Sequence, residues 1–216
     1  KSTQESCRGT LVRGPAPGAT AARAKEYFGM QPLILWQWPL RPRAGWHLPQ
    51  RPELGLEQIY DVAHNIAKIE EHTVAGQQQT LCIHRKGATR AFPAKHPDIP
   101  SIYRDIGQPV LIPGDMGRYS YVAVGTEIAM KETFGSTAHG AGRVQSRSAA
   151  KHSLKGGDVV RSLAAKGITV KTGSISSLAE EAPEAYKDVA DVVDVAHQAG
   201  ISLKVLRSVP MGVIKG

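Results

Sequence analysis

The spacing of proline is the feature that most constrains how this chain can fold. Seven of its 14 prolines lie within the first 52 residues, and five of them recur at short intervals, at Pro32, Pro39, Pro42, Pro49 and Pro52. Each proline lacks a backbone donor and interrupts both helices and central strands. Because neither a regular helix nor a regular strand can continue through prolines at this spacing, we expect residues 1–52 to form an aberrant or poorly ordered segment.

The same segment also carries most of the excess charge. It holds eight basic and two acidic residues, a net of +6, together with all three tryptophans, whereas residues 53–216 have a net charge of only +2. A basic stripe with interleaved aromatic residues can be a nucleic-acid-binding arm. We favour the poorly ordered interpretation because of the prolines, so the basic pI indicates little about the rest of the chain.

Composition narrows the class of protein. Apolar residues make up 41% of the chain, which is typical of a globular protein, and no apolar run approaches the roughly 20 residues of a membrane-spanning helix. Two cysteines, Cys7 and Cys82, are too few for a disulfide scaffold or a Cys-rich zinc module, so we expect a cytoplasmic protein. No charged-then-apolar leader is visible, so we expect no signal peptide. The chain starts at Lys1 rather than Met, which suggests a fragment.

From Glu53 onward, helices and strands are expected in mixed order. Apolar residues at helical spacing predict a helix over 57–72, and Asp158 is expected to cap a helix over 159–166 that ends at Gly167. Further helices are expected over 126–133 and from Val189 to Gly200. The expected strands are 81–83, 110–112, 119–124 and 168–170, with a tight turn over 113–117. Because this order lacks a strict βαβ rhythm, we assign the α+β class.

The densest chemical pattern is GSTAHGAGR (135–143), which is centred on His139. Small residues on both sides of a histidine allow a ligand to approach the backbone closely, and backbone N–H groups in such a loop can cradle a phosphate. Arg143 and Arg147 are four residues apart, so on a helix they would share a face directed at an anion. His139 can act as a nucleophile toward phosphorus or as a general acid–base, and a plain glycine-rich turn is an equally weighted alternative.

Three weaker patterns lie outside this loop. His64 in DVAHN (61–65) can bind a metal, with Lys68 and Glu71 on the same face of the expected helix, although a lone histidine is more often structural. The segment HRKGATR (84–90) places cations around a glycine turn, which suits an oxyanion or simply forms a solvated loop. Lys215 next to the C-terminus is, by itself, an ordinary surface residue.

Together these motifs resemble the RtcB family of RNA-splicing ligases, which join an RNA 3′-phosphate to a 5′-hydroxyl using GTP and manganese. The resemblance covers about three quarters of the chain, from roughly Glu53 to Gly216, and concerns the C-terminal part of the family. It implies an RtcB-like mixed fold of sheet and helix. The segments that carry it are YDVAHNIAK (60–68), HRKGATRAFP (84–93), DIGQPVLIPGDMG (105–117), SYVAVGTE (120–127), FGSTAHGAGRVQSRSAAK (134–151), EEAPEAYKDV (180–189) and GVIKG (212–216).

The resemblance implies a role for each matching residue. His139 would be the nucleophile that becomes guanylylated by GTP, and His64 would bind one of two Mn²⁺ ions. The residues that would contact the guanylate or line its pocket are Asn65, Pro113, Gly114, Asp115, Met116, Ser120, Gly140, Ala141, Gly142, Tyr186 and Lys215. Many relatives carry Ser where Asp115 stands. Those that would hold phosphates of GTP or RNA are Lys86, Arg143 and Arg147. The implied partners are RNA, as tRNA halves or broken RNA, and an archease-type activator, with the ligase itself a monomer.

The chain also departs from the family pattern. The family's other metal ligands, an Asp, a Cys and two His, have no matching segment here, and Cys7 lies in an unrelated context. Because each ion needs several ligands, we expect the chain not to complete ligation alone. AKEYFGM (24–30) resembles a family segment that normally continues as Ala-Ala-Ala-Asn, so a frame disruption in the gene would account for residues 31–52. The alternatives are a non-catalytic nucleotide- or RNA-binding fragment and a metal-dependent phosphohydrolase.

Overall fold

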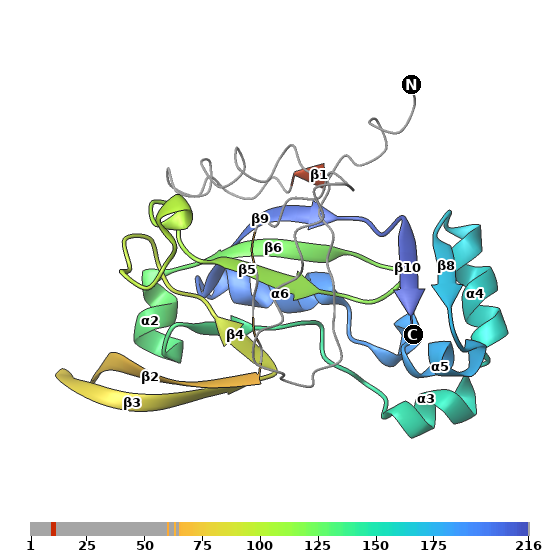
Figure 1. Cartoon of the computed structure of the whole chain (residues 1–216), viewed down its shortest axis with the longest axis horizontal. Coiled ribbons are helices and arrows are strands. Elements are labelled where there is room, and N and C mark those ends of the chain that lie inside the picture. The colour runs from red at the N-terminus through yellow and green to blue at the C-terminus, as the bar shows by residue number, and fades with distance from the viewer. Residues whose placement is uncertain (1–9, 12–59, 61–62, 64, 216) are drawn as a thin grey trace.

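The structure, a computed structural model, describes residues 10–11, 60, 63 and 65–215 (Figure 1). Its centre is an antiparallel four-stranded sheet with the strand order β1-β9-β6-β5. These strands span Thr10–Leu11, Ser202–Ser208, Ser120–Gly125 and Pro109–Pro113. The short strand β1 comes from residues 1–52, and the rest of that segment lies outside the described residues.

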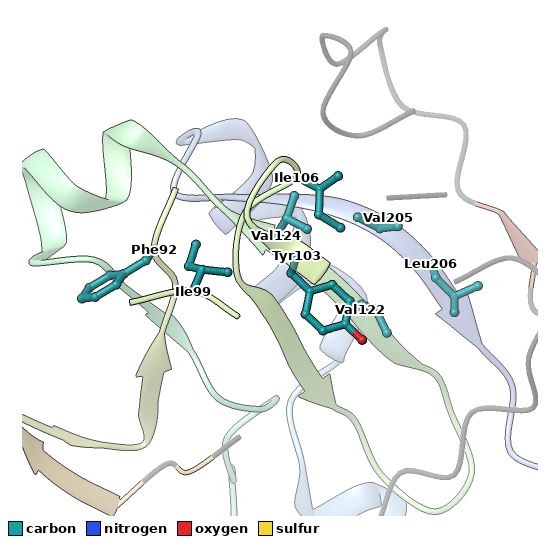
Figure 2. Packing of buried hydrophobic residues seen from close by; sticks show 8 residues of the cluster. All are labelled: Phe92, Ile99, Tyr103, Ile106, Val122, Val124, Val205 and Leu206. Atoms are coloured by element: carbon teal, nitrogen blue, oxygen red, sulfur yellow. The ribbon is translucent and has the colours of Figure 1, made fainter. Parts of the chain in front are cut away.

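The two faces of the sheet carry separate cores, because successive side chains of a strand point to opposite sides. In β6, Val122 and Val124 belong to one core, and Tyr121 and Ala123 belong to the other. The first core is completed by the segment between β4 and β5, which includes the short helix η2 (Ser101–Tyr103). Figure 2 shows its eight buried residues, Phe92, Ile99, Tyr103, Ile106, Val122, Val124, Val205 and Leu206. The second face is covered by α6 (Val189–Gln198).

Two of the helices predicted from the sequence around this sheet are confirmed. In α2 (Glu127–Thr133), the Thr126 hydroxyl accepts a hydrogen bond from the backbone of Ala129 at 3.1 Å, as an N-cap residue does. Helix α6 starts after Asp188, and Gly200 follows its end with a φ of +72°. The strands predicted over 110–112 and 119–124 are confirmed as parts of β5 and β6.

A smaller lobe lies beside the central sheet, at the right of Figure 1. Its strands β8 (Thr169–Thr172) and β10 (Gly212–Lys215) pair in parallel. Its helices are α3 (Arg147–Ser153), α4 (Gly156–Ala165) and α5 (Ile175–Glu180). The predicted N-cap at Asp158 is wrong, because Lys155 O already accepts the first helical bond and Lys155 is the cap. Gly167 does end α4 as predicted, with a φ of +75°.

The sequence prediction of a helix over 57–72 is wrong where the structure describes it. Residues Asn65–Val74 form the strand β2, which pairs with β3 (Gln77–Lys86) as an antiparallel hairpin. The strand predicted over 81–83 is confirmed within β3. Ile69, one of the apolar residues at helical spacing that led to this prediction, is 70% exposed, whereas Glu70 and His72 are buried.

A second small pair of strands joins this hairpin to the rest of the chain. Strand β4 (Ala88–Arg90) pairs with β7 (Ser136–Ala138). The mixture of mainly antiparallel sheets with helices confirms the α+β class. Within the described part of the chain, no helix combines the length and hydropathy needed to cross a bilayer.

Candidate active site

His139 directly follows β7 and lies beside the turn that follows β3. The ladder between β4 and β7 ends at the pair Ala88↔Ala138, and the backbone N–H of His139 continues it by donating to Gly87 O at 3.3 Å. Gly87 has a φ of +71°, which favours glycine. Lys86 ends β3 and pairs in register with Asn65. The structure therefore brings Asn65, Lys86 and His139 to one end of the neighbouring strand pairs.

The residues after His139 pack against the end of β5. The N–H of Ala141 donates to Pro113 O at 3.2 Å, and a Cβ added to Gly140 would lie 3.2 Å from the same oxygen. Gly142 has a φ of +73°, and its carbonyl accepts from Lys187 N at 3.0 Å. Gly140 is therefore needed for close contact with Pro113, and Gly142 for its backbone conformation. The N–H of Ala141 is hydrogen-bonded to Pro113 O and is not available to a ligand.

The turn between β5 and β6 is built by its own side chains. Asp115 Oδ1 accepts from the N–H of Gly117 at 2.9 Å, and its Oδ2 forms an ion pair with Arg118 Nε at 2.8 Å whose geometry is not that of a hydrogen bond. Burial raises the pKa of Asp115, opposed by the Gly117 hydrogen bond and the Arg118 charge. Ser120 Oγ accepts from Gly114 N at 3.4 Å. The carboxylate of Asp115, which resemblance assigns to the nucleotide pocket, thus supports the turn itself.

Met116 has a packing role in the same turn. It lies against the core of the smaller lobe, which contains Val159, Leu163 and Ile168. A Cβ added to Gly117 would lie 3.1 Å from Leu163 and 3.0 Å from Pro183. The turn is therefore wedged between the central sheet and the smaller lobe.

Arg118 connects this turn to the segment that contains Tyr186. Its Nη2 donates to Pro183 O at 2.7 Å and to Tyr186 O at 3.3 Å, and its Nη1 lies 3.5 Å from Asp188 Oδ2. Sequence reasoning did not single out Arg118, because its partners other than Asp115 lie more than sixty residues further along the chain.

Arg143 is occupied by contacts within the protein. Its guanidinium lies 4.7 Å from the centre of the Tyr186 ring, and Nη1 donates to Tyr186 Oη at 2.9 Å. Its Nε donates to Gln145 O at 2.9 Å and its Nη2 donates to Glu180 O. The expectation that Arg143 and Arg147 share a helix face is wrong, because Arg143 forms a β-bridge with Tyr186 and only Arg147 lies in α3.

The remaining candidate residues surround the carboxylate of Glu181. Tyr186 Oη donates to Glu181 Oε2, and the carboxylate lies 3.6 Å from Arg143 Nη1, 3.5 Å from Arg147 Nε and 3.8 Å from Lys215 Nζ. Burial, together with Glu181, raises the pKa of Tyr186 to about 12. We call Glu181, Arg143, Arg147, Tyr186 and Lys215 the Glu181 cluster. Sequence reasoning missed Glu181, and the acidic pair in EEAPEAY was the available signal.

The metal expected from the resemblance finds no complete set of ligands in the described residues. His64 lies outside them, and within them no group of three or more His, Cys, Asp or Glu side chains is arranged to hold a metal ion. The carboxylates near the site are already paired with arginine or lysine side chains. These residues therefore do not fit a metal centre by themselves.

An apolar groove lies next to the strand that leads into His139. It has a volume of about 560 Å³ and lies between β4, β7 and α6. Its lining includes Ala88, Ala138 and Val195, and Val195 is exposed. His139 does not line this groove, so the groove is adjacent to the candidate site and separate from it.

Comparison with known proteins identifies the family. The family model described as tRNA-splicing ligase RtcB matches residues 42–216. The chain belongs to the RtcB family. The RtcB match begins ahead of the Glu53 boundary expected from the sequence. Among RtcB proteins, the tRNA-splicing ligase of Archaeoglobus fulgidus is 62% identical over 164 residues, which are 76% of this chain and 34% of that protein.

Other RtcB relatives give the same result. The Methanocaldococcus jannaschii tRNA-splicing ligase is 60% identical over 76% of this chain and 17% of its own length. The Thermococcus kodakarensis tRNA-splicing ligase is 57% identical over 76% of this chain and 34% of its own length. The chain thus spans about a third or less of the RtcB relatives that it matches.

Proposed function

We propose that this chain carries the nucleotide-transfer part of a GTP-dependent RNA ligase. The reaction joins an RNA 3′-phosphate, or a 2′,3′-cyclic phosphate, to a 5′-hydroxyl through a guanylylated His139, in tRNA splicing or RNA repair. Support comes from relatives named as tRNA-splicing ligases. The observation that carries the proposal is the contact of the His139 loop with both the Gly87 turn and Pro113, because it joins three separate motifs into one site.

His139 would act as a covalent catalyst. A nitrogen of its neutral imidazole attacks the α-phosphorus of GTP, a P–N bond forms, and pyrophosphate leaves with the electrons of the broken P–O bond. An oxygen of the RNA 3′-phosphate then attacks the same phosphorus and releases the imidazole. A 2′,3′-cyclic phosphate would first be opened by water, which breaks the P–O2′ bond and leaves a 3′-phosphate and a 2′-hydroxyl. The RNA 5′-hydroxyl finally attacks the activated 3′-phosphate, loses its proton, and GMP leaves. Covalent catalysis divides one difficult joining step into easier ones.

The other residues would bind and orient the reactants. Lys86 and Asn65 are neighbours across the hairpin beside His139, which suits contact with phosphates and guanylate. Arg147 has a side chain that is 73% exposed, so it can reach an RNA phosphate, whereas Arg143 holds the loop around Tyr186. Lys215 and the Pro113–Ser120 turn would contact the guanine. Since the described residues do not make a metal centre, we assign no step to Mn²⁺; His64 would be its ligand in this chain.

Labelling with radioactive GTP tests the proposal. In a chimera, residues 42–216 replace the corresponding part of the Archaeoglobus fulgidus relative, and the protein is incubated with α-³²P-GTP and Mn²⁺. We expect acid-labile label on the chimera, none after His139→Ala, and normal label after His152→Ala, which alters an exposed histidine of α3. Label retained by His139→Ala contradicts the assignment. GTP hydrolysis without labelled protein favours a phosphohydrolase. GTP binding without hydrolysis and without labelled protein favours a non-catalytic fragment.

A further inference from the structure

Glu181 joins side chains that come from four different segments of the chain. It follows the last residue of α5, and its side chain is only 16% exposed. Its carboxylate contacts Arg143 from the loop after His139, Arg147 from α3, Tyr186 from the segment before α6, and Lys215 from β10. A contact set this dispersed in sequence is a tertiary feature, because no single local element could produce it.

The hydrogen bonds around Tyr186 have a fixed direction. Its hydroxyl accepts from Arg143 Nη1 at 2.9 Å and donates to Glu181. The guanidinium of Arg143 covers one face of the ring. The Tyr186 hydroxyl therefore makes its hydrogen bonds within the protein. The Arg143 guanidinium and the Glu181 carboxylate together hold the ring in one orientation.

The charges of the cluster need the carboxylate. Three cations, Arg143, Arg147 and Lys215, surround Glu181, and three like charges this close repel one another unless an anion lies between them. Arg143 is fixed by additional backbone carbonyls, so it would stay in place without Glu181. Lys215 is attached by the pairing of β10 with β8, while its ammonium group lies near Glu181. Among the described residues, no other ion pair holds the charged group of Lys215 or that of Arg147, so loss of the carboxylate would release both side chains.

We propose that Glu181 is a positioning residue that holds the Lys215 ammonium and the Tyr186 ring where a guanine nucleotide binds. Glu181 makes no contact with the reacting atoms. This inference rests on the proposed function, since that function makes Lys215 and Tyr186 nucleotide contacts.

This role predicts opposite effects on two probes. A carboxylate between cations repels phosphate, so its removal leaves binding of a bare phosphate unchanged or makes it tighter. Binding of the guanine base depends on Lys215 and Tyr186 being in place, so the same removal weakens a guanine nucleotide. General damage to the fold would weaken both probes, which separates positioning from a merely structural role.

Titrations of the 216-residue chain with GMP and with inorganic phosphate, followed by NMR, test the inference. We expect Glu181→Gln to weaken GMP by about tenfold, as loss of a charged hydrogen-bonding partner commonly does, without weakening phosphate. Glu181→Asp restores the charge and recovers part of the GMP affinity. Glu184→Gln is the matched control, because Glu184 is an exposed carboxylate in the neighbouring helix η3 (Pro183–Ala185).

A spectroscopic readout accompanies the titrations. With ¹³C-labelled tyrosine, we expect the Tyr186 phenol to ionise at lower pH in Glu181→Gln than in the wild type, because the carboxylate no longer raises its pKa. GMP binding that is unchanged in Glu181→Gln overturns the inference and leaves the proposed function intact. Equal weakening of GMP and phosphate also overturns it. If the wild-type chain binds phosphate but no GMP, the nucleotide site itself is wrong and the positioning role is overturned with it.

Discussion

At the scale of single residues, the most heavily committed side chain is Arg85. It is 1% exposed and binds both oxygens of Glu70 at 2.7 Å. Its remaining bonds go to Ser136 Oγ and Phe134 O, and His72 Nε2 lies 3.0 Å from Glu70. A buried charge is tolerated only when it is paired and hydrogen-bonded. Arg85 therefore attaches the β2–β3 hairpin to β7, the strand that leads into His139.

Removing the partner of Arg85 should unfold the chain more easily. We predict that Glu70→Gln lowers the free energy of unfolding by about 3–5 kcal/mol, because it leaves the Arg85 charge buried without a counter-ion. Urea denaturation measures the change. Glu71→Gln is the control, since Glu71 is exposed on the opposite face of the hairpin, and its cost should stay near 0.5 kcal/mol or less. Equal effects of the two substitutions would contradict the role of Arg85.

The same pair predicts a pH dependence. Burial alone would raise the pKa of Glu70, but its hydrogen bonds with Arg85 and His72 outweigh burial and hold the pKa below its usual value. A lowered folded-state pKa gives stability above the unfolded-state pKa, about 4.3, that is lost as pH falls through the folded value. The stability advantage of the wild type over Glu70→Gln should thus be present at neutral pH and shrink below about pH 4. A constant difference down to pH 2 would refute this.

At the scale of elements, the hairpin shows why sequence periodicity failed. Ile66, Ile69 and their neighbours fit a helical stripe, and this pattern predicted the wrong element. The inward face of β2 instead carries Glu70 and His72, whose burial depends on Arg85 fifteen residues later. Because the inward-facing residues of β2 are polar and ion-paired, the strand lacks the alternation of apolar and polar residues by which a half-buried strand is predicted. Only the tertiary partner reveals it.

Elements whose signals are local were predicted well. β5, β6, α2 and α6 are marked by apolar runs, by the Thr126 cap and by Gly200, all within a few residues of the element. The motifs of the candidate site were also visible in the sequence. Arg118 and Glu181 were not, since their importance comes from contacts between segments far apart in the chain.

The turn between β5 and β6 should tolerate no added side chain at its first position. A Cβ on Gly114 would lie 2.1 Å from Tyr119 O and 2.8 Å from Val189 Cγ1. Because both neighbours belong to the packed core, we predict that Gly114→Ala costs about 3 kcal/mol of unfolding free energy, as overpacking does. Thermal or urea unfolding measures it. Gly173→Ala, where nothing lies within 4 Å, is the control, and a similar loss there would argue against a local clash.

At the scale of the molecule, the candidate site lies where two lobes meet. The β5–β6 turn belongs to the central sheet, yet Met116 packs against the smaller lobe and Arg118 binds the segment before α6. Lys215 reaches the Glu181 cluster from the last strand, β10. The positions of the site residues therefore depend on the packing of both lobes. A substitution that destabilises either lobe should disturb the site.

The 216-residue chain should bind GTP weakly and join no RNA by itself. The family reaction implied by the resemblance uses two Mn²⁺ ions, whereas the described residues hold no metal-binding group and His64 is the one recognisable ligand. Losing one electrostatic stabiliser commonly costs ~10²–10³ in rate, and losing a metal should cost more. The chain also spans only 34% of the Archaeoglobus fulgidus relative. The assay mixes the chain with Mn²⁺, GTP and RNAs bearing 3′-phosphate and 5′-hydroxyl ends. Joined RNA from the chain alone would overturn the prediction, and joining that requires a separately expressed N-terminal part of that relative would support it.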